Sequence, residues 1–479
     1  MLHKDQASDI FAKIKKYSTA EGVEALFYGG HSALTRFANN TIHQNVAEEH
    51  YGVSVRTVFG GRTARASTNK LDDDSLRRVV RASEDLAKVQ QPDPDLLPMA
   101  TPNDVMASAK HELEETVRKS SGVATSYRGI ASRHFEQTAR TSPEERAGAV
   151  EKMVRVAKGH GLTTAGIFAI SDAIEGIFNS RGVAQWHQQT AADISVTMLR
   201  DDSSGWQKAN SPDVSTLNPL QLAEIAAKKA VDSAKPQEIA PGKYTVILEP
   251  AAVLDIVGFM FYDFSGLAIL DQRSFLNNRI GEKIFGENIN VWDDVDHPLQ
   301  SGARFDGEGV TRQHVQLIEN GVVKRLVYAR GSAKKMRESE HAAKVGPIEV
   351  TGHGFPLPNE IGEAPMNVVF GAPQHPKTTG EMVAGTERGV LVTRLWYIRE
   401  VDPYEKILTG MTRDGTFLIE DGKLRGGVRN FRFNESLLHM LSNVEEMGKP
   451  VRASGEESFD MVVPAMKVRE FNFTEVTKF

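Results

Sequence analysis

Residues 33–67 decide the amino-terminal fold, and they read ALTRFANNTIHQNVAEEHYGVSVRTVFGGRTARAS. Two pairs of turn-forming residues, Asn39-Asn40 and Gly60-Gly61, separate segments that look like sheet strands. Such pairs favour the tight turns that join neighbouring antiparallel strands. We therefore predict a meander with strands at residues 33–38, 41–45, 50–59 and 62–67.

Helices and further strands are predicted around this meander. Apolar residues recur at helical spacing from Ile10 to Tyr17, and Asp72 to Ser75 precedes an amphipathic helix that runs to Ala87. Ser142-Pro143-Glu144-Glu145 has the form of a capping box, so a helix should run from there to about residue 160. Four prolines make residues 90–102 a connector. The other predicted elements are strands at residues 23–28, 162–170, 175–179 and 183–199 and a helix at residues 219–234.

The pattern changes after residue 242. Short strands now alternate with glycines and with the turn signals Asn320-Gly321, Asp414-Gly415 and Asp421-Gly422. The segment Pro236 to Pro241 follows a helix and precedes this change, so it is the best boundary. We predict an α+β protein. Residues 1–235 form an N-terminal α/β domain with an antiparallel sheet and packed helices, and residues 242–479 form a C-terminal domain of mostly antiparallel β structure.

The composition is that of a soluble globular protein. Of 479 residues, 40% are hydrophobic and 25% are charged, and this length exceeds what one hydrophobic core usually serves. A net charge of −6 argues against nucleic acid as the main partner. No stretch approaches the roughly 18 apolar residues of a membrane span, and the first twenty residues lack the apolar core of a signal peptide. We expect a cytoplasmic protein without a membrane partner.

The inventory of catalytic residues is poor. The chain has no cysteine, which removes thiolate metal ligands, iron–sulfur clusters and a cysteine nucleophile. No two histidines have the spacing of a helical zinc site, and His111-Glu112 offers one ligand only. Neither a Gly-x-Ser-x-Gly elbow nor a phosphate-binding glycine loop occurs. The acidic run Asp293 to Asp296 beside His297 is interpreted as a solvated turn rather than a cation site.

Several long motifs are more informative than this search for catalytic patterns. The first half contains RFANN at 36–40, YGVSVR at 51–56, GGRTA at 60–64 and the helix at 75–87; the second half contains VILEP at 246–250, NRIGEK at 278–283, DGEG at 306–309, LIENGVVK at 317–324 and NFRFN at 430–434. In this order they resemble the TldD/PmbA family, once called modulators of DNA gyrase. The resemblance covers most of the chain except roughly residues 106–141.

What the resemblance implies depends on the family's metal motif. Members with metal carry His-Glu-x-x-x-His after the Leu-Glu-Pro strand and a cysteine near the carboxyl terminus. Here Leu254 and Phe259 occupy the histidine positions and Asp255 occupies that of the glutamate, while Gly448 to Gly455 contains no cysteine. Val462 to Val468 is similar to the end of the metal-free TldE/PmbA branch.

The resemblance therefore implies a non-catalytic subunit without metal or cofactor. Its expected partner is a TldD-like subunit that carries zinc, with a homodimer when the chain is isolated, and the pair would degrade short or unfolded peptides. Because exposed strand edges bind peptide backbones whatever the side chains, we expect edges in the second half to bind substrate. The candidate residues are Gly389, Val390, Leu391, Val392, Thr416, Phe417 and Leu418.

Two other functions remain open at this point. The chain could be an independently active zinc metallopeptidase that uses loop histidines such as His314, His353 or His375. Alternatively, it could bind DNA gyrase, as the old family name suggests, although the sequence has no basic stripe or known DNA-reading module.

Overall fold

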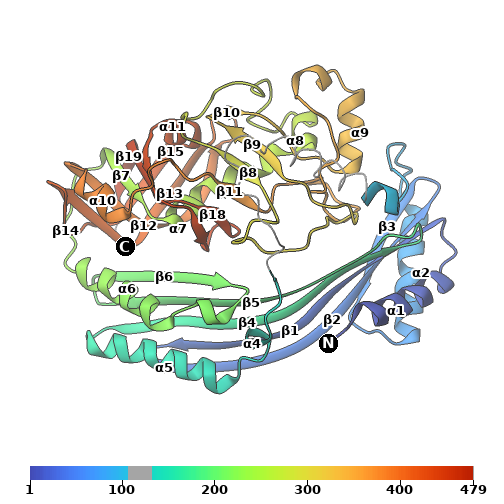
Figure 1. Ribbon diagram of the computed structural model, residues 1–479, viewed down its shortest axis with the longest axis horizontal. Coiled ribbons are helices and arrows are strands. Elements are labelled where there is room, and N and C mark those ends of the chain that lie inside the picture. The colour runs from blue at the N-terminus through green and yellow to red at the C-terminus, as the bar shows by residue number, and fades with distance from the viewer. Residues whose placement is uncertain (106–131, 478–479) are drawn as a thin grey trace.

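The computed structural model describes residues 1–105 and 132–477, and three β-sheets organise this part of the chain (Figure 1). The predicted helix start at His111-Glu112 lies outside the described residues. The N-terminal sheet has six antiparallel strands in the order β3-β2-β1-β4-β5-β6. Their bounds are β1 Gly22–Ala38, β2 Thr41–Phe59, β3 Arg62–Thr68, β4 Thr163–Asn179, β5 Ala184–Leu199 and β6 Ser204–Ser211.

The long strands of this sheet correct several predicted breaks. The strands predicted at 23–28 and 33–38 are one strand, β1, and the same holds for 41–45 with 50–59 and for 162–170 with 175–179. Gly29 and Gly30 do not end β1, because they have φ of 127° and 144° and continue it. A Cβ would lie 2.2 Å from the His50 carbonyl at Gly29 and 2.0 Å from the Asp172 carbonyl at Gly30, so only glycine fits. Strand β6 was not predicted.

Helices cover one face of the N-terminal sheet. The helices α1 (Lys4–Tyr17) and α2 (Asp73–Val89) pack at one end, and α5 (Pro143–Gly159) and α6 (Pro219–Asp232) pack at the other (Figure 1). The predicted caps are confirmed: the Asp72 carboxylate accepts from the Ser75 N–H, and Ser142 forms a capping box with Glu145. Two short helices, α4 (Glu136–Ala139) and η1 (Val214–Thr216), complete this half.

Five strands of the second half close on themselves. The order β12-β7-β19-β15-β13 continues into a direct pairing of β12 with β13, so these strands form a closed barrel. We call it the C-terminal barrel; β14 pairs with β13, and β16 pairs with β19. Closure removes free edges from the paired segments. The bounds are β7 Gly242–Leu248, β12 Arg388–Asp402, β13 Ile407–Glu420, β14 Lys423–Gly427, β15 Phe431–Ser436, β16 Val444–Met447 and β19 Met466–Val476.

A smaller sheet and several helices pack against this barrel around one large core. The sheet has the order β10-β9-β8-β11-β18-β17, with β8 Val291–Asp293, β9 Val315–Glu319, β10 Val322–Val323, β11 Val368–Phe370, β17 Val451–Ala453 and β18 Met461–Val463. The helices are α7 Pro250–Val257, η2 Gly258–Phe264, α8 Gly266–Leu270, α9 Arg330–Glu338, η3 Ala342–Lys344, α10 Thr379–Ala384 and α11 Leu437–Ser442. The predicted α+β class is confirmed.

The predicted turns are mostly correct. Asn39-Asn40, Gly60-Gly61, Asn320-Gly321 and Asp421-Gly422 all have positive φ and join antiparallel strands. Asp414-Gly415 is the exception, because it lies inside β13 where the register with β12 shifts. Its positive φ values therefore mark a bulge and not a turn. No helix in the described ranges is long and apolar enough to cross a membrane.

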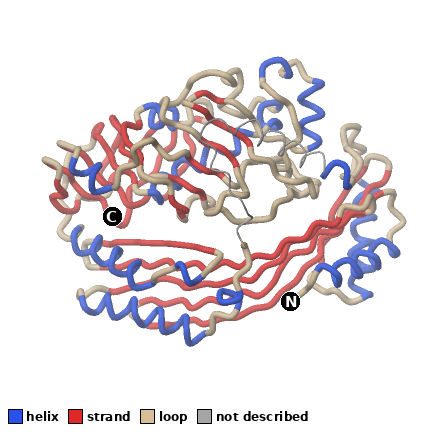
Figure 2. The backbone as a smooth tube through the Cα atoms, viewed as in Figure 1, coloured by secondary structure: helices blue, strands red, loops and turns tan. Residues whose placement is uncertain are grey.

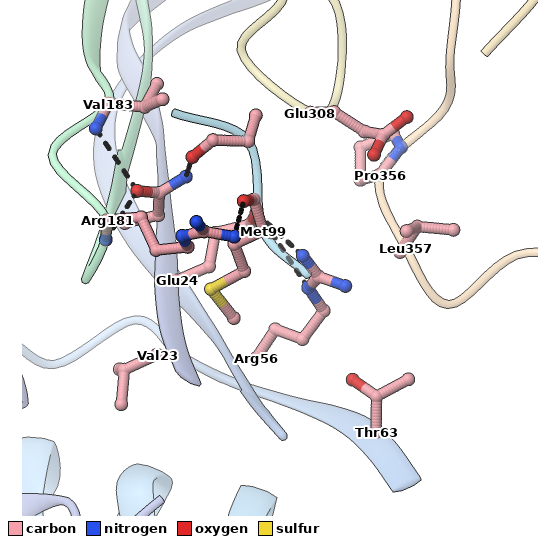
Figure 3. A network of polar contacts seen from close by, with 12 residues as sticks. Val23, Glu24, Arg56, Thr63, Met99, Arg181, Val183, Glu308, Pro356 and Leu357 are labelled. Atoms are coloured by element: carbon pink, nitrogen blue, oxygen red, sulfur yellow. Dashed lines mark hydrogen bonds and ion pairs between the residues drawn. The ribbon is translucent and has the colours of Figure 1, made fainter. Parts of the chain in front are cut away.

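Polar contacts join the two halves where the N-terminal sheet runs beneath the loops of the second half (Figure 2). Glu24 and Arg56 are both buried and form two parallel hydrogen bonds of 3.0 and 3.1 Å (Figure 3). Arg65 donates to the same Glu24 carboxylate at 2.6 Å and to the Leu357 carbonyl at 2.8 Å. Charge-assisted hydrogen bonds of this kind fix the loop at Leu357 against the sheet.

Candidate functional site

The helix α7 and the start of η2 carry the residues at the positions of the family's metal motif. Glu249 precedes the helix and Pro250 occupies its first position, where the missing N–H costs nothing. Leu254 and Asp255 have no exposed surface. The helix ends at Val257, so Phe259 lies in η2, where it is only partly buried and lines a cavity. Leu254 is thus a core residue, whereas Phe259 is only partly buried against the same core.

Asp255 fixes a distant loop to this helix. Its Oδ1 atom accepts hydrogen bonds from the backbone N–H groups of Glu456 and Glu457 at 3.1 and 3.2 Å. Its Oδ2 atom is buried and has no hydrogen-bond partner. Burial disfavours the charged form and raises the pKa of Asp255 to about 6, although the two backbone N–H groups oppose the shift.

Two glycines allow the loop to approach so closely. A Cβ at Gly455 would lie 2.2 Å from Asp255 Oδ1, and a Cβ at Gly258 would lie 1.8 Å from the Ser458 Oγ atom. Residues 455–458, which we call the covering loop, therefore lie directly on α7 and the start of η2. The covering loop begins at Gly455, the last residue of the segment Gly448 to Gly455 in which the resemblance places the family's cysteine, so the structure brings the end of that segment to the motif positions.

The covering loop is also attached to both halves of the chain. Glu457 accepts from the Tyr397 N–H at 2.7 Å and from the Ile398 N–H at 3.4 Å, both on β12. Lys208 of β6 donates to the Gly455 carbonyl at 3.0 Å and lies 3.6 Å from the Glu456 carboxylate. These contacts hold the loop between the N-terminal sheet and the barrel.

A cavity of about 560 Å³ opens beside the covering loop. Its apolar lining includes Phe259, Tyr262 and Phe459, and the charged groups include Lys406 and Glu400. The complete lining is Gly258, Phe259, Tyr262, Asp263, Ala268, Arg273, Met366, Glu400, Lys406, Glu457, Ser458 and Phe459. The size and the mixture of aromatic walls and few charges are typical of small-ligand sites.

Lys406 is the buried cation of this cavity. Its Nζ atom lies 2.6 Å from Asp263 Oδ2 and 2.6 Å from Glu400 Oε2. Burial raises the pKa of Asp263, and the Lys406 ammonium opposes that shift. The three charges form a compact network at the cavity wall, with Lys406 shared between two carboxylates.

The strands predicted as peptide-binding edges are not edges. Gly389, Val390, Leu391 and Val392 pair with β7 on one side and with β13 on the other. Thr416, Phe417 and Leu418 pair with β12, and β14 with the segment after it covers their other side. The prediction of an exposed edge at these residues is wrong, because in the closed barrel both sides of each of these strand segments are hydrogen-bonded to neighbours.

The loop histidines of the alternative zinc site have separate surroundings. His353 is buried and uses both ring nitrogens, with Thr351 Oγ1 at 2.9 Å and Asp293 Oδ1 at 3.0 Å. The rings of His314 and Trp292 lie 6.2 Å apart and are tilted by 31°, and His375 is exposed. In residues 1–105 and 132–477, no three His, Asp or Glu side chains lie together as metal ligands would.

The residues of the acidic run Asp293 to Asp296 also have different surroundings. Asp293 is buried and bonds to His353 and to the Asn367 N–H, whereas Asp296 pairs with Arg304. The interpretation as a solvated turn is therefore wrong for Asp293, because its carboxylate belongs to the core. Sequence reasoning missed Lys406, Asp263 and Glu457 altogether, since no motif joins residues that are so far apart in the chain.

Comparison with protein families gives two matches. A model described as the PmbA/TldA metallopeptidase C-terminal domain matches residues 241–475, and the model of PmbA/TldA metallopeptidase domain 1 matches residues 23–87. A metalloprotease PmbA homolog of Haemophilus influenzae is 23% identical over 407 residues, which are 82% of this chain and 79% of that protein. An uncharacterized protein of Methanocaldococcus jannaschii is 32% identical over 158 residues, which are 32% of this chain and 36% of that protein.

Solved structures share the fold over nearly the whole chain. TldE from Thermococcus kodakarensis has a TM-score of 0.80 at 18% identity, with 98% of this chain and 99% of that chain covered. A candidate modulator of DNA gyrase from Thermotoga maritima has a TM-score of 0.78, also at 18% identity, with 98% and 99% covered. At a sequence identity this low, the comparison shows that the folds are alike and shows nothing more.

Proposed function

Because the chain belongs to the PmbA/TldD metallopeptidase family, we propose that it is the metal-free subunit of a two-subunit protease that degrades short or unfolded peptides. In this proposal a partner of the same family carries zinc and cuts the peptide bond. The present chain shapes the chamber in which the peptide is held. The surroundings of Asp255 are the observation that carries the proposal.

The residues at the motif positions do not fit a zinc ion. Zinc in proteins is held by about four ligands drawn from cysteine, histidine and carboxylates. Leu254 and Phe259 have no lone pair to offer, and the chain has no cysteine. One Asp255 oxygen is already occupied by two backbone N–H groups, which leaves a single buried oxygen. We therefore derive no catalytic step through a metal bound to this chain.

The cavity beside the covering loop supports a role in holding peptide. It lies next to Phe259, at the place where the motif positions meet the terminal segment. Aromatic walls accept apolar side chains, while Glu400 and Glu457 can accept hydrogen bonds from a peptide amine or a basic side chain. Such a cavity can bind part of a peptide. Its lining offers no set of ligands for a metal ion that would activate water.

Metal analysis tests the proposal most directly. We expect no stoichiometric zinc in the dialysed chain, and zinc in the complex with its co-purified partner. The same two samples should be incubated with an unfolded peptide, and only the complex should cleave it. One tightly held zinc per isolated chain together with cleavage of the peptide would refute the assignment and would favour the independently active peptidase.

A further inference from the structure

A second cavity lies between the N-terminal sheet and the loops of the second half. Its volume is about 470 Å³, and we call it the sheet cavity. Strands β1 and β4, which are neighbours at the centre of the sheet, form its floor. Residues 305–307 and Pro356 of the second half also line it. The sheet cavity shares no lining residue with the cavity beside the covering loop, so it is a separate site.

Small residues form the middle of this floor. Gly30 of β1 has no side chain, and its partner on β4 is Ala173. Tyr28 lies over Gly52 of β2, because a Cβ at Gly52 would be 2.6 Å from the Tyr28 Cζ atom. The Tyr28 ring therefore leans toward β2 and away from β4. On the β4 side the residue opposite Tyr28 is Glu175, so the space between these two side chains stays open to the cavity.

Glu175 is a carboxylate without a partner. It forms no hydrogen bond or ion pair with any described residue. Its exposed surface opens into the cavity, where the surrounding protein replaces bulk water; this burial raises the pKa of Glu175, and the charge of Arg312 opposes the shift. Asp306, which also lines the cavity, differs because its carboxylate accepts from three backbone N–H groups. A cation beside Glu175 would stabilise its ionised form.

The other walls favour an organic cation over a metal ion. Several lining side chains from both halves are apolar, and they include Leu26, Ile177, Phe305 and Pro356. In the part of the chain that the structure describes, no group of three ligand side chains could hold a metal ion. Tyr28 is 42% exposed, and the face of a tyrosine ring attracts a cation. An alkyl chain that ends in an ammonium group matches this combination, because its methylenes can contact apolar walls while its charge stays beside a carboxylate.

We propose that the sheet cavity binds an alkylammonium group, with Glu175 as its counter-ion and Tyr28 as an aromatic wall. The group is carried by a lysine side chain of a peptide or by a free polyamine, since both present methylenes that end in the same charge. The proposed site lies within this one chain. It goes beyond the proposed function, because it requires neither zinc nor a partner subunit.

Isothermal titration calorimetry of the isolated chain with acetyl-Gly-Lys-Gly-amide tests the site. We choose pH 8 and about 0.15 M salt, so that carboxylates are ionised and long-range attraction to the acidic protein is screened. His31 and His50 also line the cavity and would repel a cation if protonated, which is a second reason for this pH. One peptide should bind per chain. The same peptide with norleucine in place of lysine should bind about tenfold more weakly or worse, because it keeps the methylenes and lacks the charge.

Two pairs of variants locate the bound charge. Glu175→Gln keeps the shape of the side chain and should weaken binding of the lysine peptide by about tenfold or more. Glu224→Gln, on the exposed face of α6, removes the same charge outside the cavity and should leave binding unchanged. Tyr28→Leu should weaken binding by about two- to fivefold, whereas Tyr28→Phe keeps an aromatic ring and should bind as the wild type does. Circular dichroism melts should show that all four variants are folded.

Spermidine, titrated in the same way, separates the two sources. Tighter binding of spermidine than of the lysine peptide assigns the site to a free polyamine, and the reverse order assigns it to a basic peptide. The proposal is overturned if neither probe binds, if the norleucine peptide binds as tightly as the lysine peptide, or if Glu175→Gln leaves binding unchanged. Loss of binding in Glu400→Gln but not in Glu175→Gln would also overturn it, since the cation would then occupy the cavity beside the covering loop.

Discussion

Replacing Asp255 by asparagine should change the dependence of stability on pH. The Asp255 carboxyl is fully buried, and its pKa rises from the ordinary 3.8 to about 6. In the range between these values the native state keeps a proton that the unfolded chain has lost. Stability contributed by this group is therefore full below pH 3.8 and is lost as the pH rises to about 6.

The magnitude follows from the size of the shift. About 2 pKa units correspond to roughly 3 kcal/mol at neutral pH, of which about 1.3 kcal/mol is lost between pH 5 and 7. The asparagine side chain of Asp255→Asn cannot ionise, and its carbonyl can still accept from the Glu456 and Glu457 N–H groups. Its amide nitrogen would be buried without a partner, which costs about 1 to 3 kcal/mol at every pH. The constant cost and the pH-dependent gain can thus be separated.

Urea unfolding at several pH values between 5 and 8 measures both quantities. The free energy of unfolding of Asp255→Asn, relative to wild type, should rise by about 1 kcal/mol from pH 5 to 7 and then stay level. Exposed Asp201 provides the control, since Asp201→Asn should give a difference that does not change over this range. A relative stability of Asp255→Asn that is flat from pH 5 to 8 would refute the reasoning about burial.

Three other predictions concern this site. Gly258→Ala should destabilise the fold by roughly 1 to 3 kcal/mol, because its Cβ would meet the covering loop, whereas Gly331→Ala, with nothing within 4 Å, should stabilise α9 slightly. Urea unfolding compares the two, and equal effects would contradict the clash. Lys406→Met should cost roughly 3 kcal/mol by leaving a carboxylate unpaired, and adding Asp263→Asn should recover part of that loss in the same assay. Restoring the metal motif should give weak zinc binding at best and no cleavage by the chain alone, because the terminal thiolate and the groups that orient imidazoles are missing. That variant, tested by zinc titration and peptide cleavage, carries Leu254→His, Asp255→Glu and Phe259→His.

The parts of the fold that the sequence predicts are those set by local hydrogen bonds. Asn39-Asn40 forms a turn because both residues tolerate positive φ, and Asp72 and Ser142 start helices because their side chains accept from N–H groups three residues on. The predicted break between strands 23–28 and 33–38, at Gly29-Gly30, is wrong because the conformation of these glycines is not set locally. The neighbouring carbonyls that require glycine there belong to β2 and β4, so the cause lies far away in the chain.

The prediction of exposed strand edges is wrong for the same reason. Val390 and Leu418 have the composition of a strand, but the sequence around them does not reveal that β7, about 145 residues earlier, pairs with one side of β12. The charged network of the cavity is equally hidden, because Lys406 meets Asp263 across a large separation in sequence. Only the resemblance to a family directed attention to α7, since the local pattern there is that of an ordinary core helix.

Asp255 gives a physical reason why the site can keep its shape without a metal. In metal-bearing relatives the resemblance places ligands on the helix and on the terminal segment, so the ion itself would tie the two together. Here one carboxylate oxygen ties Asp255 to the backbone of residues 456 and 457, which are about 200 residues away. Ionising this buried group costs energy, but two hydrogen bonds to the charged form offset part of that cost. A nonpolar residue at position 255 would remove the hydrogen-bond acceptor of those two N–H groups. The carboxylate at the glutamate position is therefore accounted for by its structural contact, and no catalytic role is needed to explain it.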